Sequence, residues 1–170
     1  WQQILKNRPT REVPLPIQMG LFSELKMIID SYSDGYALDN IIKCWSGPDK
    51  SKQDFNFENF LVEVKSHKTE KGPIISIASE HQLFGTNKPI FLVTYALTII
   101  NNGDTIKSLA DLILSKLNRL HTKNFFMRKL YEYGYEYYKN YTDLYSFIID
   151  DKSCYEVSNV FQKITSEILT

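Results

Sequence analysis

The stretch QDFNFENFLVEVKS, residues 53–66, alternates between apolar and polar side chains over most of its length. Its first two phenylalanines share one face of an extended chain. After a bend at residues 58–59, the apolar residues Phe60, Val62 and Val64 share another face, because successive side chains of a strand point to opposite sides. Two alternating runs joined by a short polar bend predict a β-hairpin.

The second arm of this hairpin carries the triplet Glu63-Val64-Lys65. A Glu-x-Lys triplet is expected about 0.6 times by chance in a chain of this size, and a second copy stands at Glu24-Leu25-Lys26. In a strand, Glu63 and Lys65 project to the same face while Val64 points to the core. In a helix, the side chains of the other triplet lie about 200° apart. Strand phase therefore selects Glu63 and Lys65 as a candidate pair.

Asp54 stands at the start of the first hairpin arm. Paired strands lie about 4.8 Å apart, so this acid converges with Glu63 if the register allows. Clustered carboxylates suit a hard divalent cation such as Mg²⁺, and an adjacent Lys65 could orient the attacking water or stabilise charge on a phosphorane. This set predicts metal-dependent phosphodiester chemistry. The alternative is an ordinary hairpin whose Glu and Lys face solvent.

Glu24 joins the candidate site through its position on a helix that starts near residue 18. Leu21, Leu25 and Ile28 form an apolar stripe at helical spacing, and Glu24 lies about 60° from Leu21 at the edge of that stripe. From there it could reach the edge of the sheet and complete a metal shell. The alternative is a rim residue or a neighbour of Lys26.

The remaining pattern predicts strands and helices in the order helix, three or four strands, short helix, strand and helical tail. We expect the cluster of aromatic residues at 125–145 to pack in the core rather than to stack on bases. The expected elements are a strand at 74–78, a short helix from Ser79, a buried strand at 90–97, a turn at 101–104, helices at 108–120 and 124–138, and a closing hairpin formed by residues 144–149 and 153–157.

Composition bounds the classes of protein to which the chain could belong. Its 170 residues fit one domain, and no run of about 18 apolar residues predicts a membrane span. The charges of the 20 basic and 20 acidic residues cancel, so the net charge gives no electrostatic signature of DNA binding. A neutral chain can still carry its basic residues on one face. Two isolated cysteines, Cys44 and Cys154, predict free thiols in a reducing, cytoplasmic compartment. The chain starts at Trp1 without a signal peptide, and we expect it to be part of a longer protein.

Several motifs occur in an order that resembles a family of PD-(D/E)XK nucleases, often encoded in bacterial restriction and phage-defence clusters. QMGLFSEL resembles the family's "QxGLFGEL" helix, and IASEHQL is similar to its "ISSxxQL". The resemblance covers about residues 17–165. The matching motifs are QMGLFSEL (18–25), WSGP (45–48), DF (54–55), VEVK (62–65), IASEHQL (77–83) and YEV (155–157), the last followed by Phe161 and Ile164.

The resemblance implies a single α/β domain with a restriction-endonuclease-like core. That core is a mixed central β-sheet flanked by helices at about residues 17–100, followed by a helical and hairpin extension at about 104–170. Asp54 and Glu63 would bind the metal, with Glu24 completing the shell directly or through water. Lys65 would position the water, and Gln82 would support the site. The literal Pro-Asp pair contains Asp49, which remains the alternative ligand to Asp54.

The implied activity is an Mg²⁺- or Mn²⁺-dependent endodeoxyribonuclease acting on double-stranded DNA, with Lys68, Lys71 and Lys88 as candidate phosphate contacts. A homodimer and further subunits of a defence system are the expected partners, and no membrane is expected. Two other classes remain open. One is a catalytically silent module that binds DNA or assembles a defence complex, and the other is a purely structural subunit.

Overall fold

A four-stranded mixed β-sheet organises the computed structural model, which describes residues 13–47, 53–71 and 88–157. The strands follow the order β1-β2-β3-β4. β2 runs antiparallel to β1 and parallel to β3, and β3 runs antiparallel to β4. The predicted mixed α/β class is confirmed. The strands are β1 (Phe55–Asn56), β2 (Leu61–Lys68), β3 (Ile90–Asp104) and β4 (Phe147–Val157).

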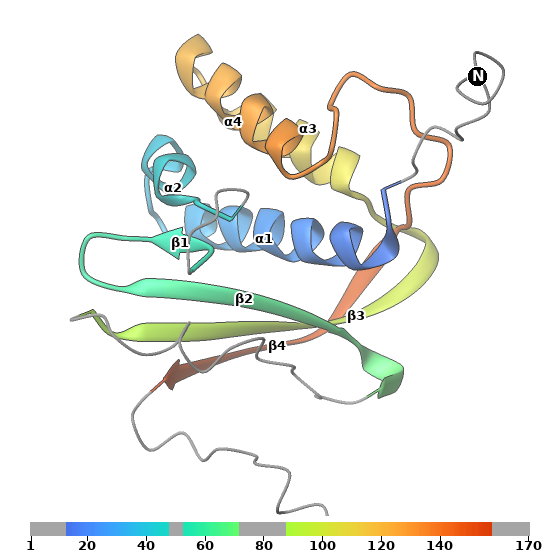
Figure 1. Ribbon diagram of the computed structural model, residues 1–170, viewed down its shortest axis with the longest axis horizontal. Coiled ribbons are helices and arrows are strands. Elements are labelled where there is room, and N and C mark those ends of the chain that lie inside the picture. Colours follow the sequence, from blue (N-terminus) through green and yellow to red (C-terminus); the bar gives the residue numbers. More distant parts are fainter. Residues whose placement is uncertain (1–12, 48–52, 72–87, 158–170) are drawn as a thin grey trace, which may run out of the picture.

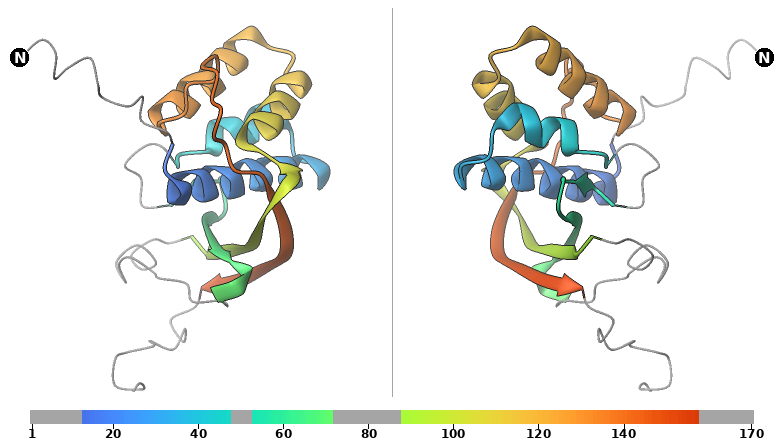
Figure 2. Two further views of the ribbon diagram at one scale, coloured as in Figure 1. Left: turned by 90° about the vertical axis from the view of Figure 1, so that its right-hand side faces the viewer. Right: turned by 90° about the vertical axis from the view of Figure 1, so that its left-hand side faces the viewer.

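All the α-helices of the described ranges lie on one side of this sheet (Figures 1 and 2). Helix α1 packs directly on the sheet, chiefly against β2, and α2 and α3 pack against α1. Helix α4 lies in the outer layer and contacts α2. None of these helices is long and apolar enough to cross a membrane. The helices are α1 (Leu15–Ser33), α2 (Leu38–Cys44), α3 (Ile106–Lys116) and α4 (Leu120–Glu132), and a 3₁₀ turn, η1 (Thr69–Lys71), follows β2.

Helix α1 forms because an apolar stripe coincides with clear signals at both ends. A proline stands in its first turn, where the missing N–H has no helical partner to lose. Leu21, Leu25 and Ile28 are fully buried, as their helical spacing predicts. The helix ends at Ser33, and two residues later Gly35 adopts a φ of 97°, a conformation that favours glycine. The N–H of Tyr36 then donates to the carbonyl of Ser31 across that turn.

The predicted β1–β2 hairpin is confirmed. Phe55 pairs with Val62 and Asn56 with Leu61. The two phenylalanines of its first arm are buried, and Val62 and Val64 belong to the main hydrophobic core. The alternating pattern therefore places the valines toward α1 and leaves the intervening polar side chains for the other face.

The predicted turn at 101–104 is wrong, because β3 continues through these residues to Asp104. Ile99 and Asp104 both pair with Phe147, so the residues between them bulge out of the ladder. Gly103 makes this possible, since a Cβ there would lie 2.3 Å from the carbonyl oxygen of Phe147. What looks like a turn in the sequence is a bulge in a 15-residue strand.

The predicted closing hairpin is also wrong, because residues 147–157 form one strand, β4, along β3. The polar run that suggested a turn is satisfied by neighbouring elements instead. Asp150 accepts hydrogen bonds from Thr69 and Thr98, and Lys152 donates to Asp30 on α1 at 2.7 Å. With these partners, the polar side chains of residues 150–152 are accommodated in an extended strand, and no turn forms there.

The two predicted helices after β3 are present with shifted ends, and β4 then returns the chain to the sheet. Helix α4 begins earlier than predicted, and it also ends earlier, because Gly134 adopts a φ of 98° just beyond its C-cap. Part of the aromatic cluster is core: Phe126 and Tyr135 are fully buried, and several partly buried rings pack against them. Its exposed members are Tyr131, Tyr138 and Tyr145. The strand predicted at 74–78 and the helix from Ser79 lie outside the described residues.

Candidate active site

Asp54 lies immediately before β1, at the position where the hairpin register brings it beside Glu63. Extending the pairing of Phe55 with Val62 by one residue would place Asp54 opposite Glu63. The Asp54 Oδ2 atom accepts a hydrogen bond from the backbone N–H of Val64 at 2.7 Å. Its own carbonyl accepts one from the N–H of Ser46, also at 2.7 Å. The carboxylate is therefore held against the strand that carries the Glu-x-Lys triplet.

Glu63 and Lys65 lie together on one face of β2, as strand phase predicts. The Lys65 Nζ atom is 2.5 Å from Glu63 Oε1, and the Glu63 side chain is only 6% exposed against 29% for Lys65. Val62 and Val64 are buried in the core on the opposite face. The solvent-facing alternative does not describe Glu63, which is buried.

Glu24 is buried at the middle of α1, with both carboxylate oxygens hydrogen-bonded. The indole Nε1–H of Trp45 donates to Oε2 and the hydroxyl of Tyr133 donates to Oε1, each at 2.6 Å. Pairing with Lys26 is not what holds this side chain. Sequence reasoning missed both partners. Trp45 stood in a recognised motif, but nothing local linked Tyr133 to a residue more than a hundred positions earlier.

Two glycines make room for this arrangement. A Cβ at Gly47 would lie 1.9 Å from Glu24 Oε2, and a Cβ at Gly20 would lie 2.9 Å from the hydroxyl oxygen of Tyr133. Contacts this short are excluded, so each position needs glycine or a shift of the side chain that it faces. Gly47 directly follows Trp45 and Ser46, so one short segment shapes the surroundings of both Glu24 and Asp54.

Burial and neighbouring charges raise the pKa values of two acids of this cluster, Glu24 and Asp54. Burial, then the charge of Asp54, raises the pKa of Glu24 to about 8, although Trp45 and Tyr133 oppose the shift. Burial, then the charge of Glu63, raises the pKa of Asp54 to about 7, against the Val64 N–H and Lys65. Burial lowers the pKa of Lys65, but its hydrogen bond and ion pair with Glu63 outweigh that and raise it overall. The lysine therefore stays an ammonium.

With all three acids ionised, these four side chains carry three negative charges and one positive, a net of −2. This excess suits a divalent cation. Mg²⁺ commonly binds through one or two carboxylates and keeps several waters, so Asp54 and Glu63 fit as ligands. Across residues 13–47, 53–71 and 88–157, no three acidic, His or Cys side chains are placed to enclose an ion. A carboxylate offers about four lone-pair sites, so Glu24 could still accept a bond from a metal-bound water.

Other predicted residues stand apart from this cluster or outside the described ranges. Gln82 and Asp49 lie outside the described ranges, and of the two alternative ligands the structure describes Asp54. Lys88 donates to Asn56 Oδ1 at 3.1 Å and to the carbonyl of Phe57 at 2.9 Å, which braces the hairpin. The remaining candidate phosphate contacts, Lys68 and Lys71, lie at the end of β2 and in η1.

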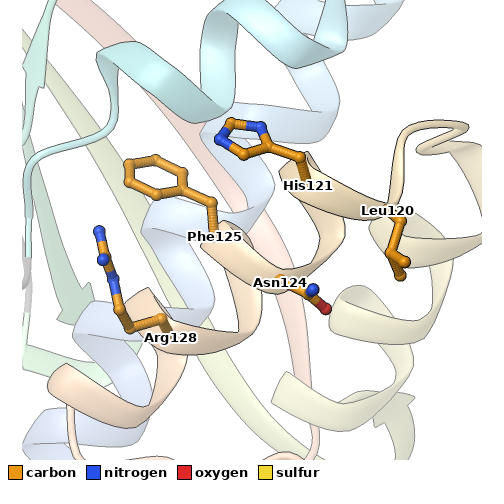
Figure 3. Close-up of a pocket in the computed structure, with 5 residues that line it drawn as sticks. All are labelled: Leu120, His121, Asn124, Phe125 and Arg128. Atoms are coloured by element: carbon orange, nitrogen blue, oxygen red, sulfur yellow. The ribbon is translucent and has the colours of Figure 1, made fainter.

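A separate hollow of about 500 Å³ lies on the outer side of α4 (Figure 3). His121, Phe125 and Arg128 line it, and the Arg128 guanidinium sits 5.0 Å from the centre of the Phe125 ring. It contains none of the carboxylates described above. Because no acidic side chain lines this hollow, it is not the candidate active site.

Comparison with known proteins gives one match. The family model DUF4420, with the description "Putative PD-(D/E)XK family member", matches residues 1–170 of the chain. No curated protein and no solved structure matches it.

Proposed function

This chain belongs to the PD-(D/E)XK family DUF4420, and from that membership we propose that it is a divalent-metal-dependent endonuclease that hydrolyses DNA phosphodiesters. Family membership suggests a nuclease-type enzyme. The observation that carries the finer proposal is the adjacency of Asp54, Glu63 and Lys65. Asp54 is bonded to the N–H of Val64, and its neighbours Glu63 and Lys65 are paired at 2.5 Å.

Each side chain has a part in this proposal that follows from its surroundings. Asp54 and Glu63 would hold the cation through their carboxylates, and the cation would supply Lewis acidity and a water of lowered pKa. Lys65, partly exposed and anchored by Glu63, presents its ammonium to a water or to the non-bridging phosphate oxygens. Glu24 is buried on α1, and its carboxyl would add negative charge once a bound cation favours its ionised form.

Cleavage of supercoiled plasmid with Mg²⁺ or Mn²⁺ tests this proposal. Glu63→Gln and Lys65→Met keep the approximate size of the side chains and should lower the cleavage rate by about 10²-fold or more. Glu58→Gln and Lys43→Met, at exposed positions outside the cluster, are matched controls and should cleave like the wild type. Equal rates for the wild type and both cluster variants would rule out this site.

A second function is a catalytically silent module that binds DNA or assembles a defence complex. One observation favours it: within the described ranges, no three acidic, His or Cys side chains lie close enough together to hold one metal ion. A wild-type protein that binds DNA in a gel-shift assay, yet cleaves neither plasmid nor oligonucleotide with any divalent ion, would support this function over catalysis.

The setting of the activity is also part of the proposal. We place it in bacterial restriction or phage defence, in the cytoplasm, with double-stranded DNA as substrate and a homodimer or further subunits as partners. The resemblance of the ordered motifs supports this setting, together with a cluster suited to phosphodiester hydrolysis. Sedimentation of the protein with and without duplex DNA would test the dimer, and a phage-plating assay would test the defence role.

A further inference from the structure

Tyr133, at the C-terminal end of α4, contacts the acid cluster through its hydroxyl group, which donates to Glu24. We propose that Tyr133 and Trp45 are positioning residues that hold the Glu24 carboxylate toward Asp54, so that α4 forms part of the nuclease site. This inference rests on the proposed function, because it concerns the geometry of the same acids. It assigns a site role to an element that the sequence places in a C-terminal extension.

The segment Trp45-Ser46-Gly47 links Glu24 to Asp54 through three contacts. The indole of Trp45 donates to Glu24 at 2.6 Å, and the N–H of Ser46 donates to the Asp54 carbonyl at 2.7 Å. The Cα of Gly47 passes so close to Glu24 that a side chain there would clash. A segment of three residues thus sets where both acids lie, and Trp45 is fully buried within it.

The position of Tyr133 is fixed by the end of α4 and by the ring of Trp45. It caps the C-terminus of α4, and Gly134 forms the turn that follows, in which the N–H of Tyr135 donates to the carbonyl of Leu130. Its ring stacks on Trp45 with centroids 6.5 Å apart. The space under its hydroxyl exists because residue 20 of α1 is glycine. The two donors therefore approach Glu24 from the C-terminal ends of two helices, α2 and α4, and bond both of its oxygens.

The energetics favour a site role over packing alone. Burying a carboxylate costs far more than burying an apolar side chain of the same size. Here the cost is raised further by the charges of Asp54 and Glu63, which lie within reach of Glu24. Trp45 and Tyr133 offset part of this cost through two hydrogen bonds. The arrangement keeps a carboxylate beside two other acids at the expense of stability, and such a cluster gains from a bound cation.

The test compares Tyr133→Phe and Trp45→Phe with Tyr135→Phe. Tyr135 is a matched control, because it is buried two residues away and its hydroxyl has no hydrogen-bond partner among the residues that the structure describes. Electron paramagnetic resonance of free Mn²⁺ would measure the Kd of the intact protein for Mn²⁺. Oligonucleotide cleavage would give kcat and KM separately, and thermal unfolding would verify folding.

We expect Tyr133→Phe and Trp45→Phe to raise the Kd for Mn²⁺ by about 10- to 100-fold and to lower kcat, with KM for DNA changed less than about twofold. Tyr135→Phe should match the wild type. A folded Tyr133→Phe protein with wild-type Kd and kcat would overturn the positioning role and leave the proposed function intact. If the wild type does not cleave DNA, the proposed function fails, and the Kd values for Mn²⁺ still decide the positioning role.

If removal of the hydroxyl unfolds the protein, Gly20→Ala provides the second test. The added Cβ would lie 2.9 Å from the Tyr133 hydroxyl oxygen, so we expect it to displace that hydroxyl from Glu24. We expect the same weakening of Mn²⁺ binding as for Tyr133→Phe. An unchanged Kd in a folded Gly20→Ala protein would count against the proposal.

Discussion

The carboxylate of Asp54 accepts a 2.7 Å hydrogen bond from the backbone N–H of Val64, the residue between Glu63 and Lys65. A single contact thus joins the acid of the first hairpin arm to the triplet of the second. It also uses the first N–H of β2 beyond the short ladder with β1, which would otherwise lack a strand partner. This is the relationship on which the proposed site depends.

Asp54→Asn should remove the negative charge of the side chain while keeping its hydrogen bond with Val64. The amide oxygen of asparagine can still accept from Val64, so the fold should survive with a melting temperature within a few degrees of the wild type. Cleavage should fall by about 10²-fold or more, because the negative charge is lost. Plasmid cleavage and thermal unfolding measure the two effects, with Asp34→Asn at an exposed helix end as control. Wild-type cleavage by Asp54→Asn would show that this acid is not a ligand.

The stability of the metal-free protein should fall as pH rises from about 4.5 to about 8. Burial and the charge of Asp54 raise the pKa of Glu24 from 4.5 to about 8, and burial and Glu63 raise that of Asp54 from 3.8 to about 7. Between the ordinary and the folded pKa values the folded state binds more protons than the unfolded state. The free energy of unfolding therefore decreases with pH across this window and levels off above it.

Glu24→Gln tests the assignment of that slope. The variant lacks the titrating carboxyl. As pH rises, its free energy of unfolding should therefore increase relative to that of the wild type, by on the order of a few kcal/mol at pH 8. Urea unfolding in the presence of EDTA, at several pH values from 5 to 8, would measure this difference. Parallel stability curves for the two proteins would show that Glu24 does not titrate in this range.

Lys65 should matter for both activity and charge balance. Glu63 holds its ammonium at 2.5 Å and raises its pKa despite the opposing effect of burial. Lys65→Met should lower cleavage by about 10²- to 10³-fold and destabilise the metal-free protein, because the acids lose their cation. Added Mn²⁺ should recover part of that stability, while Lys65→Arg should retain more of it. Thermal unfolding with and without Mn²⁺ would detect the difference, and its absence would contradict the charge argument.

Gly103→Ala tests the bulge in β3. The new Cβ would lie 2.3 Å from the Phe147 carbonyl oxygen, so the backbone of β3 or β4 must move, at a cost of about 1–3 kcal/mol. Asn102→Ala changes the exposed neighbouring residue and should leave stability within about 0.5 kcal/mol. Urea unfolding would measure both variants. Equal stability for the two would mean that the strands do not approach so closely at this point.

Much of the fold could be read from local patterns. The period of two in residues 53–66 predicted the hairpin and the shared face of Glu63 and Lys65, and helical spacing predicted the buried stripe of α1. The misread elements are those in which a local signal competes with a distant partner. Polar residues at 101–104 and 150–152 look like turns, but long-range pairing between β3 and β4 keeps them extended.

The candidate site divides in the same way. The sequence by itself determined that Glu63 and Lys65 share one face, because strand phase depends only on neighbouring residues. That Asp54 meets this strand was an expectation conditional on the hairpin register, which the structure supplies. Only the tertiary structure decided how Glu24 is held. Its partners Trp45 and Tyr133 come from separate elements, and Gly20 and Gly47 leave the space that they need. Such contacts depend on how helices pack, and the spacing of residues along the chain carries no record of that packing.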